Sequence, residues 1–192
     1  AVVSGYDIRT AVKEQVKSLG AKFVELELET EEAEEKGGYA KAMDEEFYRR
    51  QQGLLASVIK NSDVVITTAA VPGKKAPVLV NEDMVKQMRA GSVIVDLAAE
   101  RGGNCELTKP GETVTKHGVH ILGPLNLPSS IPFHASQMYA RNLSSFVRHL
   151  ADNGGLQPNR DDEIIRDTLL THDGKIVNER MNEILNPQKS EK

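Results

Sequence analysis

The 192 residues suffice for one domain of ordinary size, or for one domain and a portion of another. Hydrophobic residues make up 39% of the chain and charged residues 27%, as in globular proteins, and no apolar run approaches the roughly 20 residues that span a bilayer. The net charge of −4, the absence of Trp and an aromatic content of only 4% argue against a nucleic-acid partner. The single Cys105 excludes an intrachain disulfide and a multi-cysteine metal site, which favours a reducing compartment.

The first nine residues predict a short buried strand that ends in a carboxylate, Asp7, and leads into a helical pattern. In a dinucleotide-binding α/β unit, the acid at the end of the second strand accepts hydrogen bonds from the adenosine ribose hydroxyls. Such an acid follows a glycine-rich loop by about 20 residues. Here it is the seventh residue, and the chain contains no G-x-G-x-x-G. An ordinary helix N-cap or a turn acid is the alternative explanation of Asp7.

Arg9 bears on which cofactor this segment would select, because an arginine at this place can also hold a 2′-phosphate. We expect Asp7 to prevail, since a carboxylate at the ribose repels that phosphate. The segment therefore predicts NAD(H) rather than NADP(H), with Arg9 beside the adenine or the pyrophosphate.

Hydrophobic spacing predicts the elements that follow. In chain order they are a helix over 10–19, a strand over 22–28, an acidic loop over 29–35, a long helix over 39–61, a strand over 63–68, a small-residue loop over 69–77, a short helix over 81–88 and a strand over 91–96. Both 63–68 and 91–96 are runs of β-branched residues, typical of central parallel strands buried on both faces.

After residue 96 the predicted elements are shorter. They are an irregular segment over 97–109, strands over 113–115 and 120–123, a loop over 124–132, a helix over 135–150, a helix over 161–170, a strand over 175–177 and a frayed tail from 186. The alternation of strands and helices predicts an α/β fold, a Rossmann-type doubly wound parallel sheet in three layers.

The ends of parallel strands meet at one edge of a sheet, where ligands bind. Here that edge would carry residues 7–9, 67–70 and 96–100. Small residues at 68–70 allow the backbone to approach a flat ring closely, although they could equally serve only to pack the loop. The sequence has no H-E-x-x-H, P-loop or G-x-S-x-G motif and its five histidines are scattered, so we expect neither catalytic side chains nor a metal site. Any chemistry then belongs to a bound cofactor.

Two segments carry a family resemblance: DVVITTAAVPGKKAP at 63–77 and GSVIVDLAAERGGNC at 91–105. They resemble the NAD(H)-binding first domain of proton-translocating nicotinamide nucleotide transhydrogenases and, more distantly, alanine dehydrogenase. The resemblance runs from residue 1 to about 150. It implies a nucleotide-binding lobe, here 1–132, inserted into another lobe to which 133–192 returns through a long helix.

The resemblance also implies a set of nucleotide contacts. They are Asp7, Ile8 and Arg9 at the adenosine ribose, Gly38 and Tyr39 in a mobile loop over it, Gln51 nearby, and Thr68, Ala69 and Ala70 at the approach to the nicotinamide. The family's first strand, its glycine-rich loop and the arginine- and glutamine-bearing loop that holds the nicotinamide are missing from the sequence. In the strand order 3-2-1-4-5-6 the missing strand is central. We therefore expect this chain alone to be neither stable nor active.

The resemblance further implies a function. NADH bound here would pass hydride to NADP⁺ on a partner domain, coupled to proton movement through the membrane domain of a beta subunit. The protein would be a homodimer on the cytoplasmic face of the inner membrane, or on the matrix side in mitochondria. Two alternatives stay open. One is an alanine dehydrogenase-like oxidoreductase, against which the loop at 37–39 argues, and the other is a non-catalytic NAD(H)-sensing module.

Overall fold

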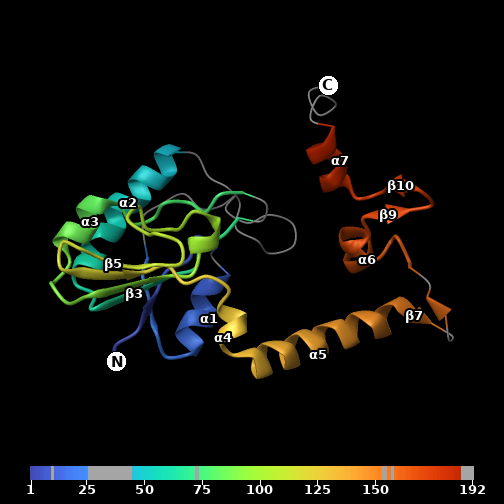
Figure 1. Ribbon diagram of the computed structural model, residues 1–192, viewed down its shortest axis with the longest axis horizontal. Coiled ribbons are helices and arrows are strands. Elements are labelled where there is room, and N and C mark those ends of the chain that lie inside the picture. The colour runs from blue at the N-terminus through green and yellow to red at the C-terminus, as the bar shows by residue number, and fades with distance from the viewer. Residues whose placement is uncertain (10, 26–44, 72–73, 153–154, 157, 187–192) are drawn as a thin grey trace. The chain divides into compact units, whose positions relative to one another are not determined.

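The computed structural model describes residues 1–9, 11–25, 45–71, 74–152, 155–156 and 158–186 (Figure 1). The chain divides into two compact units, Ala1–Leu127 and Pro128–Lys192. Gly38 and Tyr39, together with the whole predicted acidic loop over 29–35, lie outside the described residues. No helix among the described residues is long and apolar enough to cross a membrane.

The first unit alternates strands and helices as the hydrophobic pattern predicts. Its elements are β1 (Ser4–Gly5), α1 (Val12–Ser18), β2 (Lys22–Phe23), α2 (Glu45–Lys60), β3 (Val64–Thr67), α3 (Glu82–Gln87), β4 (Val93–Asp96), the 3₁₀ helix η1 (Ala99–Arg101), β5 (Thr113–Lys116) and β6 (Val119–Leu122). Helix α1 stops as predicted at Gly20, whose φ of 82° suits a residue without a Cβ. The unit is therefore α/β.

The strands of this unit form two sheets. Strands β1 and β2 pair in parallel, and a four-stranded sheet has the order β3-β4-β6-β5. Within it β3, β4 and β6 are parallel, whereas β5 is antiparallel to β6. The prediction of a wholly parallel sheet is thus wrong for β5, and the sheet is mixed and largely parallel. The cause is the two-residue turn His117-Gly118, with φ of 53° and 79°, because so short a link joins only antiparallel strands.

Strand β3 lies at the edge of the four-stranded sheet, with β4 as its neighbour. Val64 and Ile66 are 57% and 64% exposed, so the prediction that both faces of this strand are buried is wrong in this chain. A β-branched run does predict the strand itself. What it cannot supply is the neighbouring elements that would cover Val64 and Ile66.

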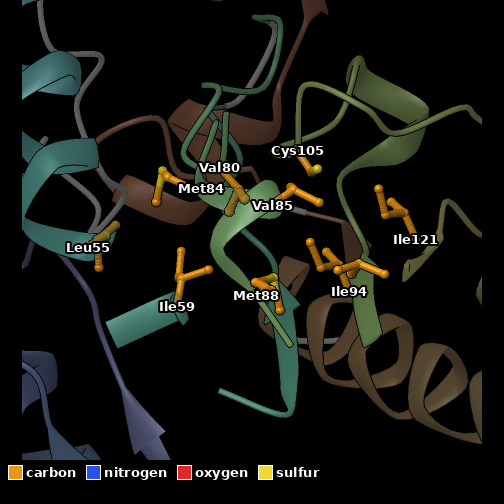
Figure 2. Packing of buried hydrophobic residues seen from close by; sticks show 10 residues of the cluster. Leu55, Ile59, Val80, Met84, Val85, Met88, Ile94, Cys105 and Ile121 are labelled. Carbon is orange, nitrogen blue, oxygen red and sulfur yellow. The ribbon is translucent and has the colours of Figure 1, made fainter. Parts of the chain in front are cut away.

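The core of the first unit joins α2, α3 and the four-stranded sheet. Figure 2 shows Met84 and Val85 of α3, and Met88 directly after it, between α2 and the sheet. The other members of the cluster are Leu55, Ile59, Val80, Ile94, Cys105, Val119 and Ile121. Each large apolar side chain buried in this way contributes about 1.5–3 kcal/mol.

The second unit consists of a long helix followed by short hairpins and helices. Its elements are α4 (Leu127–Ser130, which begins at the boundary), α5 (Pro132–Leu150), β7 (Ala151–Asp152), β8 (Gly155–Leu156), α6 (Glu163–Thr168), β9 (Thr171–His172), β10 (Lys175–Ile176) and α7 (Glu179–Leu185). The loop predicted over 124–132 contains α4, so that prediction is wrong there. Helix α5 begins three residues earlier than predicted, because a proline suits the first helical turn.

The described residues of the second unit bury little apolar surface. Among them Ile165 is the one large hydrophobic side chain that is fully buried. Met138, Leu143 and Val147, on the predicted apolar stripe of α5, are 66%, 47% and 48% exposed. The other described residues of the second unit therefore leave the stripe uncovered, and exposed apolar patches of this kind mark interaction surfaces.

Asn81 caps α3 and gives a test of how this helix is held. Its Oδ1 accepts a hydrogen bond from the backbone N of Met84 at 3.0 Å, and its Nδ2 donates to Gln52 Oε1 at 3.1 Å. Asn81→Ala is expected to lower the free energy of unfolding by about 0.5–2 kcal/mol, measured by urea denaturation. Asn81→Ser retains a cap oxygen and should lose less. Equal losses in the two variants would contradict a capping role.

Candidate functional site

Asp7 lies two residues after β1, where the chain leaves the sheet toward α1. Its Oδ1 accepts hydrogen bonds from the backbone N and Nε of Arg9, at 2.8 and 2.9 Å, and its Oδ2 accepts from Arg9 Nη2 at 2.8 Å. The two side chains are 25% and 30% exposed. The N-cap of α1 is Ala11, so Asp7 does not serve as the cap of that helix. The helix-cap explanation of this acid is thereby excluded, whereas the bond from the backbone N of Arg9 is the Asx-turn contact expected of a turn acid.

The charge of Asp7 follows from these contacts. Burial by itself raises the pKa of Asp7, but the hydrogen bonds and the positive charge of Arg9 outweigh burial and hold the pKa below its usual value. A carboxylate offers about four acceptor positions, of which Arg9 takes three. An ionised carboxylate with remaining acceptor capacity suits hydroxyl donors such as those of a sugar.

Gln51 on α2 is joined to this segment through Tyr6. Gln51 is 1% exposed, and its Nε2 donates to the hydroxyl of Tyr6 at 2.8 Å. Burial raises the pKa of Tyr6, so the phenol stays neutral and can accept this bond. The Oε1 of Gln51 is buried and has no hydrogen-bond partner among the residues that the structure describes. A buried acceptor left in this state costs about 1–3 kcal/mol.

The neighbouring glutamine ties α2 to the other side of the unit. Gln52 Nε2 donates to the carbonyl oxygen of Val78 at 2.6 Å, just beyond the loop that follows β3. Adjacent residues of α2 thus hold the end of β1 and the segment that leads into α3.

The predicted small residues after β3 form the start of what we call the approach loop, residues 68–71 and 74–77. Thr68 and Ala70 are exposed and Ala69 is half-buried. Asn104 Nδ2 donates to the carbonyl oxygens of Ala69 and Pro77, at 2.9 and 2.8 Å. The loop is therefore held near both of its ends while two of its small side chains remain open to solvent.

Asp96 ends β4, and the sequence predicts it at the ligand-binding edge. Instead its side chain is fully buried. Its Oδ1 accepts from Thr67 Oγ1 at 3.1 Å and the Ala98 backbone N at 3.1 Å, and its Oδ2 accepts from the backbone N of Asn104 at 2.8 Å and of Cys105 at 3.0 Å and from Thr108 Oγ1 at 2.7 Å. Asp96 therefore organises its own loop and presents no oxygen to a ligand.

The predicted site residues thus fall into separate groups. Asp7 and Arg9 are paired, and Tyr6 links their segment to Gln51. Ile8 is half-buried between Asp7 and Arg9, whereas Thr68, Ala69 and Ala70 lie in the approach loop, where Asn104 bonds to the carbonyl oxygen of Ala69. Sequence reasoning missed Tyr6 and Asn104 as contributors, and it predicted Asp96 at the ligand-binding edge rather than buried inside it. The sequence signal for Asp96 and Asn104 was an acid at the end of a strand, with Gly102 and Gly103 directly before Asn104.

Side chains suited to covalent or metal chemistry are otherwise engaged. Cys105 is 1% exposed, and burial raises the pKa of its thiol, so it is a packed residue as predicted. His117 Nε2 pairs with Glu82 at 2.8 Å, and His120 Nδ1 with Thr115 at 3.0 Å. Across the described residues no cluster of three or more His, Cys, Asp or Glu could hold a metal ion.

Comparison with known proteins gives a consistent match. The family model described as "Alanine dehydrogenase/PNT, C-terminal domain" matches residues 1–179. An NAD(P) transhydrogenase subunit alpha polypeptide of Rickettsia prowazekii (strain Madrid E) is 50% identical over 178 residues, which cover 93% of this chain and 46% of that protein. The chain thus spans about half the length of this relative.

A solved structure and a more distant relative complete the comparison. The crystal structure of transhydrogenase from Sinorhizobium meliloti is 43% identical, with a TM-score of 0.71, over 92% of this chain and 46% of that one. An alanine dehydrogenase from Staphylococcus saprophyticus subsp. saprophyticus is 37% identical over 133 residues, which cover 67% of this chain and 36% of that protein.

Replacing Arg9 tests the origin of the charge on Asp7. Arg9→Gln removes the guanidinium while Asp7 stays partly buried, so the pKa of Asp7 should rise. In the unaltered protein Asp7 contributes stability that is fully present above its unfolded pKa of about 3.9 and is lost as pH falls through the lower native pKa. The stability difference between protein and variant, from urea unfolding, should therefore shrink as pH falls from about 5 to about 2. A difference independent of pH would contradict the pairing.

Proposed function

The chain belongs to the alanine dehydrogenase/PNT C-terminal domain family, and on that premise we propose that it forms most of the NAD(H)-binding domain of a proton-translocating transhydrogenase. The observation that carries the proposal is the Asp7 carboxylate at the end of β1, oriented and kept charged by Arg9 and not used as a helix cap. The 50% identity to a transhydrogenase alpha-subunit polypeptide supports the same function over its alternatives.

The residues present fit the adenosine half of NAD(H). The ribose diol supplies donors that suit the remaining acceptor capacity of Asp7, with Ile8 and Arg9 on either side of the sugar. The buried Oε1 of Gln51 lacks a donor among the described residues, and a bound adenosine carries an amino group of the required kind. Arg9 is already paired with Asp7, so a 2′-phosphate would meet a carboxylate, which favours NAD(H) over NADP(H).

The remaining contacts lie at the other end of the dinucleotide. Thr68, Ala69 and Ala70 would line the approach to the nicotinamide, where their small side chains permit close packing against a flat ring. Gly38 and Tyr39 would cover the adenosine. Neither the adenosine end nor the nicotinamide end of the dinucleotide requires a catalytic acid or base from the chain.

We place the first strand and the glycine-rich loop in the region of the longer protein that this chain does not span. A parallel strand pairing with the open edge of β3 would complete a three-layer doubly wound sheet and cover Val64 and Ile66. Residues 1–132 would then be the nucleotide-binding lobe. The uncovered apolar stripe of α5 supports the proposal that 133–192 returns to a second lobe.

The bound dinucleotide supplies the hydride chemistry, and the protein supplies binding and orientation. Asp7 and its neighbours fix the adenosine, and the approach loop sets how the nicotinamide end is presented. A partner domain carrying NADP(H) would receive the hydride, and the beta subunit would couple transfer to proton movement through its membrane domain. Holding two nicotinamides face to face converts an encounter into an intramolecular step. We propose a homodimer that is peripheral to the inner membrane.

Two other functions are distinguishable from this one. The similarity to an alanine dehydrogenase over 133 residues favours an amino-acid oxidoreductase as the second candidate. A non-catalytic NAD(H)-sensing module is the third. With the complete subunit, NADH should reduce an NADP⁺ analogue only when the NADP(H)-binding partner is added. Oxidation of NADH that depends on pyruvate and ammonia would support the second candidate, and tight binding without turnover the third.

Asp7→Asn tests the ribose contact directly. Loss of one charge-assisted hydrogen bond of about 1.5–3 kcal/mol should weaken NADH binding about tenfold to a hundredfold in fluorescence titrations of the complete subunit. The same variant releases Arg9 and should narrow the preference for NADH over NADPH.

The matched control is Asp63→Asn, which also neutralises a carboxylate, at the start of β3. The Asp63 side chain is 84% exposed and pairs with Arg89 at 3.4 Å. This control should bind NADH like the unaltered subunit. If Asp7→Asn also binds NADH unchanged, Asp7 does not contact the ribose.

A further inference from the structure

Asp96 is a buried carboxylate that accepts five hydrogen bonds, two from side-chain hydroxyls and three from backbone N–H groups. Among the described residues no basic side chain forms an ion pair with it. Taking a carboxylate out of water is costly unless donors replace the water, and an apolar residue would fill the space without that cost. The five bonds to this one carboxylate fix the geometry at the end of β4.

The five donors come from both sides of the strand end. Thr67, the last residue of β3, donates its hydroxyl to Asp96, and Leu97 N donates to the carbonyl oxygen of Thr67 at 2.9 Å. The other donors belong to the segment 98–108. Asp96 thus ties the end of β3 and the loop after β4 to one group.

Gly103 allows the backbone to return to the carboxylate. Its φ is 80°, and a Cβ added there would lie 2.7 Å from Asp96 Oδ2. The next residue is Asn104, whose backbone N bonds to that same oxygen. The glycine thereby allows the backbone of Asn104 to lie against Asp96 while its side chain bonds to the approach loop.

Asn104 is fully buried and grips the approach loop near both of its ends. Its side-chain amide nitrogen, Nδ2, bonds to the carbonyl oxygens of Ala69 and Pro77. The backbone carbonyl oxygen of Asn104 accepts from the backbone N of Leu79 and of Val80, at 2.8 and 3.0 Å. One side chain therefore bonds near both ends of the loop, and Asp96 holds the backbone N of that residue in place.

We propose that Asp96 and Asn104 are positioning residues for hydride transfer, which act together to fix the position of the approach loop relative to the end of β4. The inference rests on the proposed function, in which Thr68, Ala69 and Ala70 line the approach to the nicotinamide. In this proposal Asp96 acts through the backbone N of Asn104, and Asn104 acts through the backbone carbonyl oxygens of the approach loop. A shift of this loop changes the distance over which hydride moves, while adenosine remains anchored at Asp7.

The test uses the complete subunit assembled with its NADP(H)-binding partner. Asn104→Ser removes both bonds to the approach loop, and Asn81→Ser is the matched control, since it loses one amide-donated bond without contacting that loop. We expect Asn104→Ser to lower kcat about tenfold or more at saturating NADH while the Kd for NADH changes less than about threefold. The control should alter neither value.

Two further measurements separate positioning from folding. Asn104→Ser should speed hydrogen exchange at the amide of Ala76, which bonds to Arg101 O at 2.8 Å, while amides of β4 exchange as before. Asp96→Asn should lower kcat as Asn104→Ser does, and the double variant should be no slower than the worse single variant, because the two residues act as one device.

An unchanged kcat in Asn104→Ser would overturn the inference. So would a fall in kcat that is matched by an equal loss of NADH binding or of folded protein, because that pattern is purely structural. If the unaltered assembly fails to bind NADH or to transfer hydride, the proposed function fails instead. That outcome is visible without any substitution.

Discussion

The parallel register of β3 and β4 is the constraint on which the first unit depends. It sets Thr67 beside Asp96, so that both strands end at the same level and both loops leave the sheet at one edge. The hydroxyl of Thr67 then donates a buried hydrogen bond to the carboxylate of Asp96 and joins the two strand ends. The segment after Asp96 is held by further hydrogen bonds to this carboxylate, as far as Thr108. It includes Asn104, whose side chain bonds to the neighbouring loop. A shift in this register would separate the two groups.

The two acids that end strands in this unit serve opposite purposes. Asp96 is surrounded by donors from its own chain and has no acceptor position turned outward. Asp7 is only partly buried, and one arginine holds it charged while leaving acceptor capacity. One acid therefore builds the fold and the other is suited to a ligand. Helix α2 stands between these regions, with Gln51 bonded to Tyr6 and Gln52 to Val78.

The order of strands and helices in the first unit was predictable because hydrophobic periodicity reports local structure. Burial was less so, because Val64 and Ile66 carry a pattern suited to a covered strand while this chain leaves them exposed. The antiparallel β5 depends on a two-residue turn that a search for parallel strands passes over. The sequence locates Asp7 at the end of the first strand, and its contact with a ribose stays a prediction. The contact between Tyr6 and Gln51 joins residues 45 apart in sequence, and the inward turn of Asp96 depends on backbone amides that no residue pattern displays.

Cys105 gives the chain an internal reporter. It is the single cysteine of the sequence, its backbone N is bonded to Asp96, and its side chain lies in the core drawn in Figure 2. Burial raises the pKa of its thiol, so alkylating reagents meet a group that is both hidden and protonated. The rate at which Cys105 is alkylated, measured by mass spectrometry, consequently reports how often the region around β4 opens transiently, with no foreign probe added.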